Sequence, residues 1–328
     1  MRPRPPPAAS KSLPVEPASV SPVPPQPAES PAVEPTTAPP PRPAGGVESW
    51  LDAQIELSRR GISGGPIDGV IGEQSRAALQ AFQRSQNLPA TGELDDATRA
   101  QLRPTAPPLA HYTVAPEDLA RLQPLSPTWL GKSRQSGLEY ETALEALAER
   151  FHAHPLLLHE MNFEVDWAAL KPGTRLIVPA VEGAALVGKA ARIVIRLAER
   201  VLEVRDSADN LLAHFPVGIA PGANKPPEGE LHVTVAIPRP DYIFSPETFP
   251  GSTEARELGR RLILPPGPNN PVGLAWIGLD RPGCGIHGTP SAEQGGRTEA
   301  PGCFRLANWD AVALLDLVWV GMPVLVEP

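Results

Sequence analysis

Two side chains that can carry out covalent chemistry lie near each other in the last third of the sequence. Cys303 lies within EAPGCFRLANWDA, and His287 lies within GCGIHGTP, 16 positions earlier. A cysteine becomes a good nucleophile when a nearby base removes its proton and N–H groups stabilise the oxyanion that its attack creates. The pair therefore indicates acyl transfer through a thiolate. The alternative is an inert cysteine packed in a core.

The flanking residues are of types that would assist such chemistry. His287 follows an apolar run and precedes Gly288, which places it at the end of a predicted strand. A helix is predicted shortly after Cys303, with Asn308 as its N-cap and Asp310 in its first turn. A thiol that faces the N-terminus of this helix would have a lowered pKa.

The backbone just before the predicted helix can supply donors to an oxyanion. Gly302 has no Cβ, so a substrate carbonyl could approach the backbone closely there. The candidate donors are the N–H groups of Gly302, Cys303 and Phe304, because Pro301 has no N–H to give.

The other histidines are less suited to this chemistry. His214 and His232 lie inside alternating strand patterns and are expected to be sheet residues. His152, His154 and His159 lie in a segment without cysteine or a clear set of carboxylates, so no metal site is expected there.

The segment that carries the cysteine and the histidine, residues 189–328, is predicted to be mainly β. Its first part, ARIVIRLAERVLEVRDSADNLLAHFPVGI, alternates apolar and polar residues around a turn at Asp209 and Asn210. GELHVTVAIP, GLAWIGLD and MPVLVEP supply further strands. Short strands with Pro- and Gly-rich links favour a β-sandwich, with one helix after the cysteine.

Residues 47–105 are predicted to form a three-helix domain, because apolar residues recur at helical spacing between Gly-containing turns. The segment carries a set of landmark residues: Asp68-Gly69, Ile71-Gly72, Ala78-Leu79, Phe82-Gln83, Leu88, Thr91-Gly92 and Thr98, with Ser75 where Thr is usual. Through these landmarks it resembles the peptidoglycan-binding domain family, which implies that it binds cell-wall material.

Residues 111–182 are predicted to form a small α+β module. The segment opens with YTV and closes with LKPGTRLIVPAVE, both typical of strands, and residues 143–162 between them indicate helix. The segment resembles a diverged LysM module through LAERF, LLLHEMN and LKPGTRLIVP. It departs from that family by an insertion around residues 124–137.

The N-terminal residues 1–46 are rich in Pro, Ala, Ser, Val and Glu and show no apolar periodicity, so a disordered, Pro-rich tether is expected. The net charge of −8 argues against a nucleic-acid partner. No stretch reaches the length of a membrane span, and no secretory signal is visible. We expect the natural start to lie upstream and to encode an export or anchor segment.

The 189–328 segment resembles the catalytic domain of L,D-transpeptidases, the YkuD-type family. The resemblance rests on His-Gly-Thr at 287–289, on Gly-Cys-Phe-Arg at 302–305 and on VGIAPGANKPPEGELHVTVAIPRPDY upstream. It implies a Cys303 nucleophile, a His287 base and a Gly288 carbonyl that orients the imidazole. It also implies that Thr289 contacts substrate and that Arg305 meets a substrate carboxylate or braces the loop.

The same resemblance implies peptidoglycan stem peptides as donor and acceptor, no metal or organic cofactor, and a place in the cell envelope or periplasm. Ala300-Pro301 stands where Ser-His is usual in the family, which keeps a catalytically dead wall-binding scaffold open as an alternative. L,D-carboxypeptidase action is a second alternative, because the catalytic residues would be the same. Cys284 is expected to be inert packing, although a disulfide to Cys303 would block catalysis.

Overall fold

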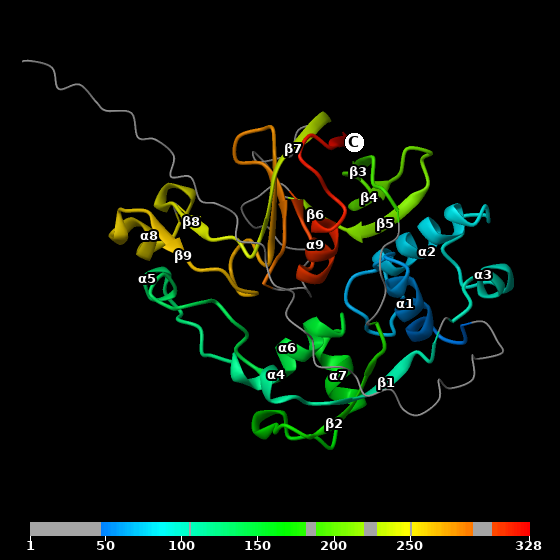
Figure 1. The fold of residues 1–328 in the computed structure, drawn as a ribbon, viewed down its shortest axis with the longest axis horizontal. Coiled ribbons are helices and arrows are strands. Elements are labelled where there is room, and N and C mark those ends of the chain that lie inside the picture. Colours follow the sequence, from blue (N-terminus) through cyan, green and yellow to red (C-terminus); the bar gives the residue numbers. More distant parts are fainter. Residues whose placement is uncertain (1–46, 105, 182–187, 220–227, 250, 291–303) are drawn as a thin grey trace, which may run out of the picture. The chain divides into compact units, whose positions relative to one another are not determined.

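The computed structural model describes residues 47–104, 106–181, 188–219, 228–249, 251–290 and 304–328. The predicted tether at 1–46, Gly302 and Cys303 lie outside these residues. Three modules follow one another along the described chain, and Figure 1 shows them in blue to cyan, green, and green to red.

The first module has the predicted helices, which are α1 (Trp50–Arg59), α2 (Glu73–Ser85) and α3 (Asp96–Gln101). Helix α1 begins with a capping box in which Ser49 and Asp52 bond each other's backbone N–H groups. Gln83 of α2 is fully buried and links α2 to the turn at Gly92 and to α3. Its amide accepts from Gly92 N and donates to Thr98 Oγ1.

The middle module is built on a two-stranded antiparallel sheet of its first and last strands. Its elements are β1 (Leu109–Thr113), α4 (Pro116–Ala120), α5 (Trp129–Lys132), α6 (Ala143–Arg150), α7 (Pro155–Met161), η1 (Trp167–Ala169) and β2 (Arg175–Pro179). The predicted end strands and the helical region between them are therefore present. The core beneath them contains Tyr112, Leu147, Phe151, Leu158 and Leu176.

The third module has the strand order β5-β4-β3-β13-β7-β10-β11-β12-β6 in one sheet. These strands are β3 (Arg192–Arg196), β4 (Val201–Arg205), β5 (Leu211–Pro216), β6 (Gly218–Ile219), β7 (Gly229–Pro238), β10 (Ala275–Leu279), β11 (Gly285–His287), β12 (Phe304–Arg305) and β13 (Pro323–Glu327). His214 and His232 lie in β5 and β7, as predicted.

The long strand β7 joins two halves of this sheet. Its first residues pair with β13, and from Val233 onward it pairs with β10. Both halves contribute to one core, which also receives Leu314 of helix α9 (Asn308–Leu315). Figure 1 shows α9 between the β7 side and the β3–β5 side. The mainly-β prediction is confirmed, but the nine strands form one hydrogen-bonded sheet, so the two-sheet sandwich stays a prediction.

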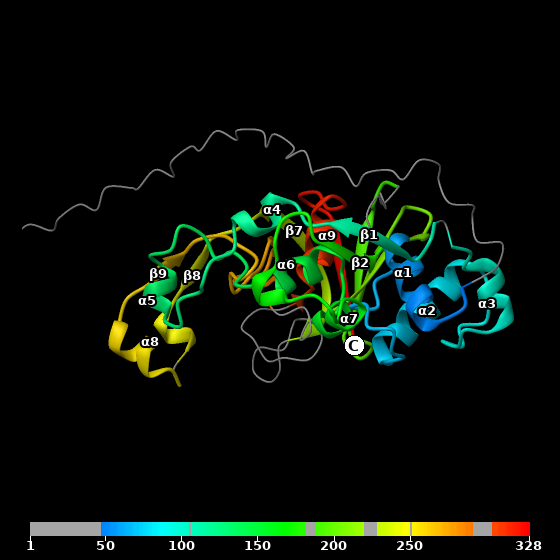
Figure 2. The same cartoon turned by 90° about the horizontal axis from the view of Figure 1, so that it is seen from below.

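An excursion between β7 and β10 forms a small unit with the insertion of the middle module. The excursion contains β8 (Tyr242–Phe244), η3 (Pro246–Thr248), α8 (Thr253–Leu258) and β9 (Leu262–Leu264). Trp129 of α5 stacks on Phe244 with ring centroids 4.7 Å apart, and Leu130 N donates to Glu254 Oε1. The insertion therefore covers the excursion, and Figure 2 shows α5 beside α8, β8 and β9.

Candidate active site

His287 is the last residue of β11, and neighbouring strands fix its backbone on both sides. It pairs with Trp276 of β10 and, in the parallel direction, with Arg305 of β12. Leu306 N also donates to the His287 carbonyl at 2.9 Å. The prediction of a histidine at a strand end is therefore confirmed, and its side chain has no exposed surface.

The imidazole is held by its own neighbour and by an aromatic ring. His287 Nδ1 lies 2.7 Å from the Gly288 carbonyl oxygen, so Nδ1 carries the proton and donates it to that oxygen. The ring stacks on Trp276 with centroids 5.6 Å apart. Nε2 is buried and has no hydrogen-bond partner among the described residues, which leaves its lone pair to accept a proton.

Burial also sets the charge of this imidazole. Removal from water lowers the pKa of His287 to about 4, helped by the nearby Arg305 charge and opposed by the hydrogen bond to Gly288. His287 is therefore neutral at pH 7. A neutral imidazole is the form that can act as a general base.

Asn308 is not the N-cap that the sequence predicts. The cap is Ala307, and Asn308 is the first helical residue, with no exposed surface. Its Oδ1 accepts from Leu274 N at 3.0 Å, and its Nδ2 donates to Pro268 O at 3.2 Å and to Glu149 Oε2 at 3.1 Å. The side chain therefore links α9 to the segment before β10, because one tertiary donor and two tertiary acceptors replace the local capping bond.

The predicted substrate contacts and the last oxyanion donor are enclosed in this structure. Arg305 and Thr289 each expose only 4% of their surface. Both roles that the sequence allowed for Arg305, bracing the loop and meeting a substrate carboxylate, stay predictions. Phe304 lies between β11 and β6, with its ring in the core, so its N–H as an oxyanion donor stays a prediction.

Cys284 corrects another expectation. It exposes 3% of its surface and packs in the core of the third module, but it is disulfide-bonded, so inert packing alone was wrong. Cys303 is the only other cysteine in the sequence. The expectation that a bond from Cys284 to Cys303 would block catalysis stays a prediction, because Cys303 lies outside the described residues.

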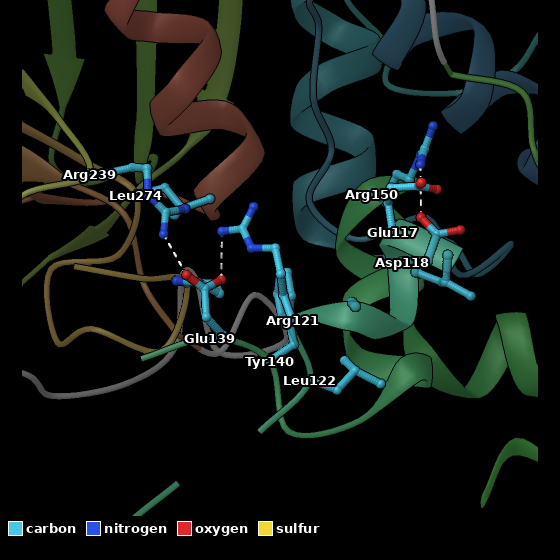
Figure 3. A pocket seen from close by; sticks show the side chains of 12 residues that line it. Glu117, Asp118, Arg121, Leu122, Glu139, Tyr140, Arg150, Arg239 and Leu274 are labelled. Atoms are coloured by element: carbon cyan, nitrogen blue, oxygen red, sulfur yellow. Dashed lines mark hydrogen bonds and ion pairs between the residues drawn. The ribbon is translucent and has the colours of Figure 1, made fainter. Parts of the chain in front are cut away.

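A cleft of about 240 Å³ lies where the middle module meets the third module. Figure 3 shows Glu139 between two arginines; its carboxylate accepts from Arg121 at 2.8 Å and from Arg239 at 2.6 Å. On the opposite wall Arg150 pairs with Asp118 at 3.1 Å. The cleft also contains Leu274, so its lining reaches the segment that Asn308 holds.

The histidines of the middle module have structural contacts. His152 stacks on Trp309 of α9 at 5.2 Å between centroids and lies 3.1 Å from Ser58 Oγ of α1. His154 accepts from Leu156 N at the start of α7. Within the described part of the chain, no group of three or more His, Cys, Asp or Glu side chains could hold a metal ion.

Sequence reasoning missed Glu149 and Trp276 at this site. Trp276 alternates with buried residues in GLAWIGLD, a pattern that fits any strand. Glu149 reads as an ordinary charged residue on an amphipathic helix, and its partner Asn308 is 159 positions away.

Comparison with known families gives two matches. Residues 190–326 match the YkuD family, described as the L,D-transpeptidase catalytic domain. Residues 47–102 match a family described as a peptidoglycan-binding domain. The LysM resemblance of the middle module stays a prediction.

Curated relatives carry related names. The protein named YkuD, a candidate L,D-transpeptidase of Bacillus licheniformis, is 24% identical over 56% of this chain and 93% of its own length. A candidate L,D-transpeptidase of Salmonella typhimurium, ErfK/SrfK, is 29% identical over 54% of this chain. YqjB of Bacillus subtilis is 34% identical over 30% of this chain. The chain spans only about half the length of the last two, 57% and 51%.

Solved structures of L,D-transpeptidases from Xylanimonas cellulosilytica and Mycobacterium smegmatis also match, at 15% and 17% identity. The first match covers 90% of this chain and all of the other, and the second covers 47% and 66%. Both TM-scores are 0.34, so neither adds to what the strand pairing shows. Residues 190–326 are thus similar to the L,D-transpeptidase catalytic domain, and residues 47–102 are similar to a peptidoglycan-binding domain.

Proposed function

We propose that the chain is a cysteine-dependent L,D-transpeptidase that cross-links peptidoglycan stem peptides. The observation that carries the proposal is the state of His287. Its Nδ1 is committed to the Gly288 carbonyl, its pKa is lowered, and its Nε2 has no partner among the described residues. A neutral imidazole held in this way suits removal of a proton from a thiol 16 positions later in the sequence.

In the proposed first half-reaction, the Cys303 thiol gives its proton to His287 Nε2, and Sγ attacks the carbonyl of the third stem residue. Backbone N–H groups at 302–304 stabilise the tetrahedral oxyanion. When this intermediate collapses, the bond to the terminal D-alanine breaks, and the proton on Nε2 passes to the leaving amine. A thioester on Cys303 remains.

In the second half-reaction, an amine from another stem peptide attacks the thioester carbonyl. His287 Nε2 takes a proton from that amine and returns it to the departing sulfur, so the free thiol is restored. The peptidoglycan-binding domain at 47–102 would hold the polymer nearby and raise the local concentration of stems.

A carbapenem tests the nucleophile directly. The protein is reduced first, because Cys284 is disulfide-bonded, and is then incubated with the drug. We expect one covalent adduct by mass spectrometry, absent in Cys303→Ala and formed far more slowly in His287→Ala. The Cys284→Ser variant should form the adduct without reduction. A reduced wild-type protein that forms no adduct would favour the scaffold alternative.

Purified muropeptides separate transfer from hydrolysis. Tetrapeptide stems should yield cross-linked dimers, whereas tripeptides alone would indicate L,D-carboxypeptidase action. We propose the cell envelope as the site of action, because the substrate lies there. None of the helices in the described residues is both long and apolar enough to span a membrane.

A further inference from the structure

A carboxylate from the middle module reaches the helix that follows the predicted nucleophile. Glu149 lies near the end of α6, and its Oε2 accepts from Asn308 Nδ2 at 3.1 Å. Its other oxygen accepts from Tyr140 at 2.7 Å. No ion pair joins Glu149 to a cation in the described ranges, so its partners there are neutral donors.

Asn308 transmits this contact to the backbone around His287. Its Oδ1 receives Leu274 N, and Leu274 directly precedes Ala275, whose carbonyl accepts from Gly288 N at 3.1 Å. The same Oδ1 lies so close to Gly288 that a Cβ there would come within 2.3 Å of it. Asn308 therefore packs directly against the residue whose carbonyl orients the imidazole.

Gly273 shows how tightly this contact is built. It has φ +61°, and a Cβ added to it would lie 2.0 Å from Asn308 Oδ1. A side chain at either glycine would push Asn308 away or displace its own backbone. The position of Asn308 and the position of the Gly288 carbonyl are thus coupled.

The middle module also holds the segment that Asn308 contacts. Leu138 N donates to Pro266 O, and Asn269 N donates to Leu138 O at 2.9 Å. The Asn269 side chain donates to Glu145 Oε1 at 2.7 Å and to Glu139 O at 3.0 Å. Residues 265–274 are therefore fixed by hydrogen bonds from the middle module on one side and from α9 on the other.

A carboxylate is a costly way merely to join two modules. Partial burial without a cation disfavours its charged form, so an apolar or amide side chain would hold the junction with less penalty. A charged acceptor does strengthen the bond from Asn308. A glutamate at position 149 is therefore better explained by its hold on the Asn308 side chain than by a contribution to the stability of the fold.

We propose that Glu149 is a positioning residue for His287 and acts through Asn308 and the Gly288 carbonyl. The middle module is then part of the catalytic apparatus. The inference rests on the proposed function, in which His287 is the base. It assigns to Glu149 the orientation and tautomer of the imidazole.

The experiment compares full-length wild type with Glu149→Ala, Glu149→Gln and Glu160→Ala. Glu160 is an exposed glutamate on α7 of the same module and serves as the matched control. Two quantities are measured: the second-order rate constant for carbapenem acylation of the reduced protein, and the ¹⁵N shifts of the His287 ring, which report the tautomer. Thermal unfolding of each variant reports stability separately.

We expect Glu149→Ala to lower the acylation rate constant by roughly 10- to 100-fold, the usual effect of removing a group that orients a catalytic residue. The Nδ1–H tautomer should lose its dominance in that variant. Glu149→Gln keeps an oxygen acceptor and should stay within about threefold of wild type. Glu160→Ala should match wild type in all measurements.

Two outcomes would overturn the inference. One is a Glu149→Ala protein with wild-type acylation and tautomer, whatever its stability. The other is an equal loss in Glu160→Ala. If wild type itself is not acylated, the proposed function fails, but the ring shifts still decide whether Glu149 positions His287. If Glu149→Ala does not fold, Tyr140→Phe removes one hydrogen bond to the same carboxylate and should alter the shifts in the same direction.

Discussion

Two carboxylates join the third module to its neighbours, and they do so by different physics. Glu203 of β4 is fully buried and lies 2.8 Å from Arg196, 2.5 Å from Arg205 and 3.5 Å from Arg84 of α2. Burial alone would raise its pKa, but the nearby His214 ring and hydrogen bonds from Arg196 and Arg205 hold that pKa well below its usual range.

Among the described residues, no ion pair joins Glu149 to such a cation. Burial raises its pKa to about 7, although hydrogen bonds from Tyr140 and Asn308 oppose the shift. The comparison shows that Glu203 keeps a fixed charge, paired mostly within the third module and reaching the first module only through Arg84. Glu149, one of several groups that join the middle module to the third, has a charge that can change near neutral pH.

The largest expected effect is the loss of the fixed charge. Glu203→Gln leaves the guanidinium groups of Arg196 and Arg205 without their one fully buried carboxylate partner, so the free energy of unfolding should fall by about 3 kcal/mol. Urea denaturation at pH 7 measures this change. Glu199→Gln, at an exposed glutamate near Arg196, is the control and should change little. A loss below about 1 kcal/mol for Glu203→Gln would contradict the comparison.

The second prediction concerns pH and has the opposite sign. Glu149 has a folded pKa of about 7, above its ordinary 4.5. Its contribution to stability is therefore fully present below pH 4.5 and is lost as the pH rises to 7. Glu149→Gln removes this dependence, so it should gain on wild type by at most about 3 kcal/mol between pH 4.5 and 8. Denaturation at both pH values checks it, and a constant difference would refute the raised pKa.

A third prediction links that titration to activity. Ionised Glu149 should hold Asn308 more firmly, so the acylation rate of wild type relative to Glu149→Gln should rise about threefold between pH 6 and pH 8. Tyr140 and Glu145 face Glu149, and residues 265–274 bring no charged side chain to it.

Asp310 needs its own control in this experiment. Burial raises its pKa to about 8, against a hydrogen bond from Ser63 of the first module. Asp310→Asn therefore removes a second titratable group, which lies in helix α9. If that variant abolishes the pH step and Glu149→Gln does not, Glu149 is not its source.

The smallest effect is expected at the rim of the Glu203 cluster. Arg84 leaves 42% of its side chain exposed and lies 3.5 Å from Glu203, so Arg84→Ala should cost less than about 1 kcal/mol. Differential scanning fluorimetry detects such a change. A loss as large as that of Glu203→Gln would mean that Arg84 is the main partner of the carboxylate.

Much of this organisation could be predicted from the sequence because it depends on local signals. The Gly-containing turns and apolar spacing of 47–105 define three helices, and alternation defines the strands that carry His214 and His232. His287 at a strand end followed from the apolar run before it. These features need only neighbours in sequence.

The rest depends on contacts across the chain. Asn308 has the residue type of an N-cap, and only tertiary partners at Pro268, Leu274 and Glu149 redirect its side chain. The insertion at 124–137 is a departure from the LysM resemblance, and the sequence assigns it no partner. Its hydrophobic residues instead have a partner in the excursion between β7 and β10, which no local pattern reveals.

Gly267 has a consequence for attempts to recombine these modules. With φ +154°, it lies so near the middle module that a Cβ there would sit 2.2 Å from the Leu138 carbonyl oxygen. Any foreign module grafted in place of the middle module must leave the space beside Gly267 that the Leu138 backbone leaves. It must also supply a hydrogen-bond acceptor for Asn308. A protein made of residues 190–326 alone would lack the contacts that Gly267 and Asn308 make with the middle module.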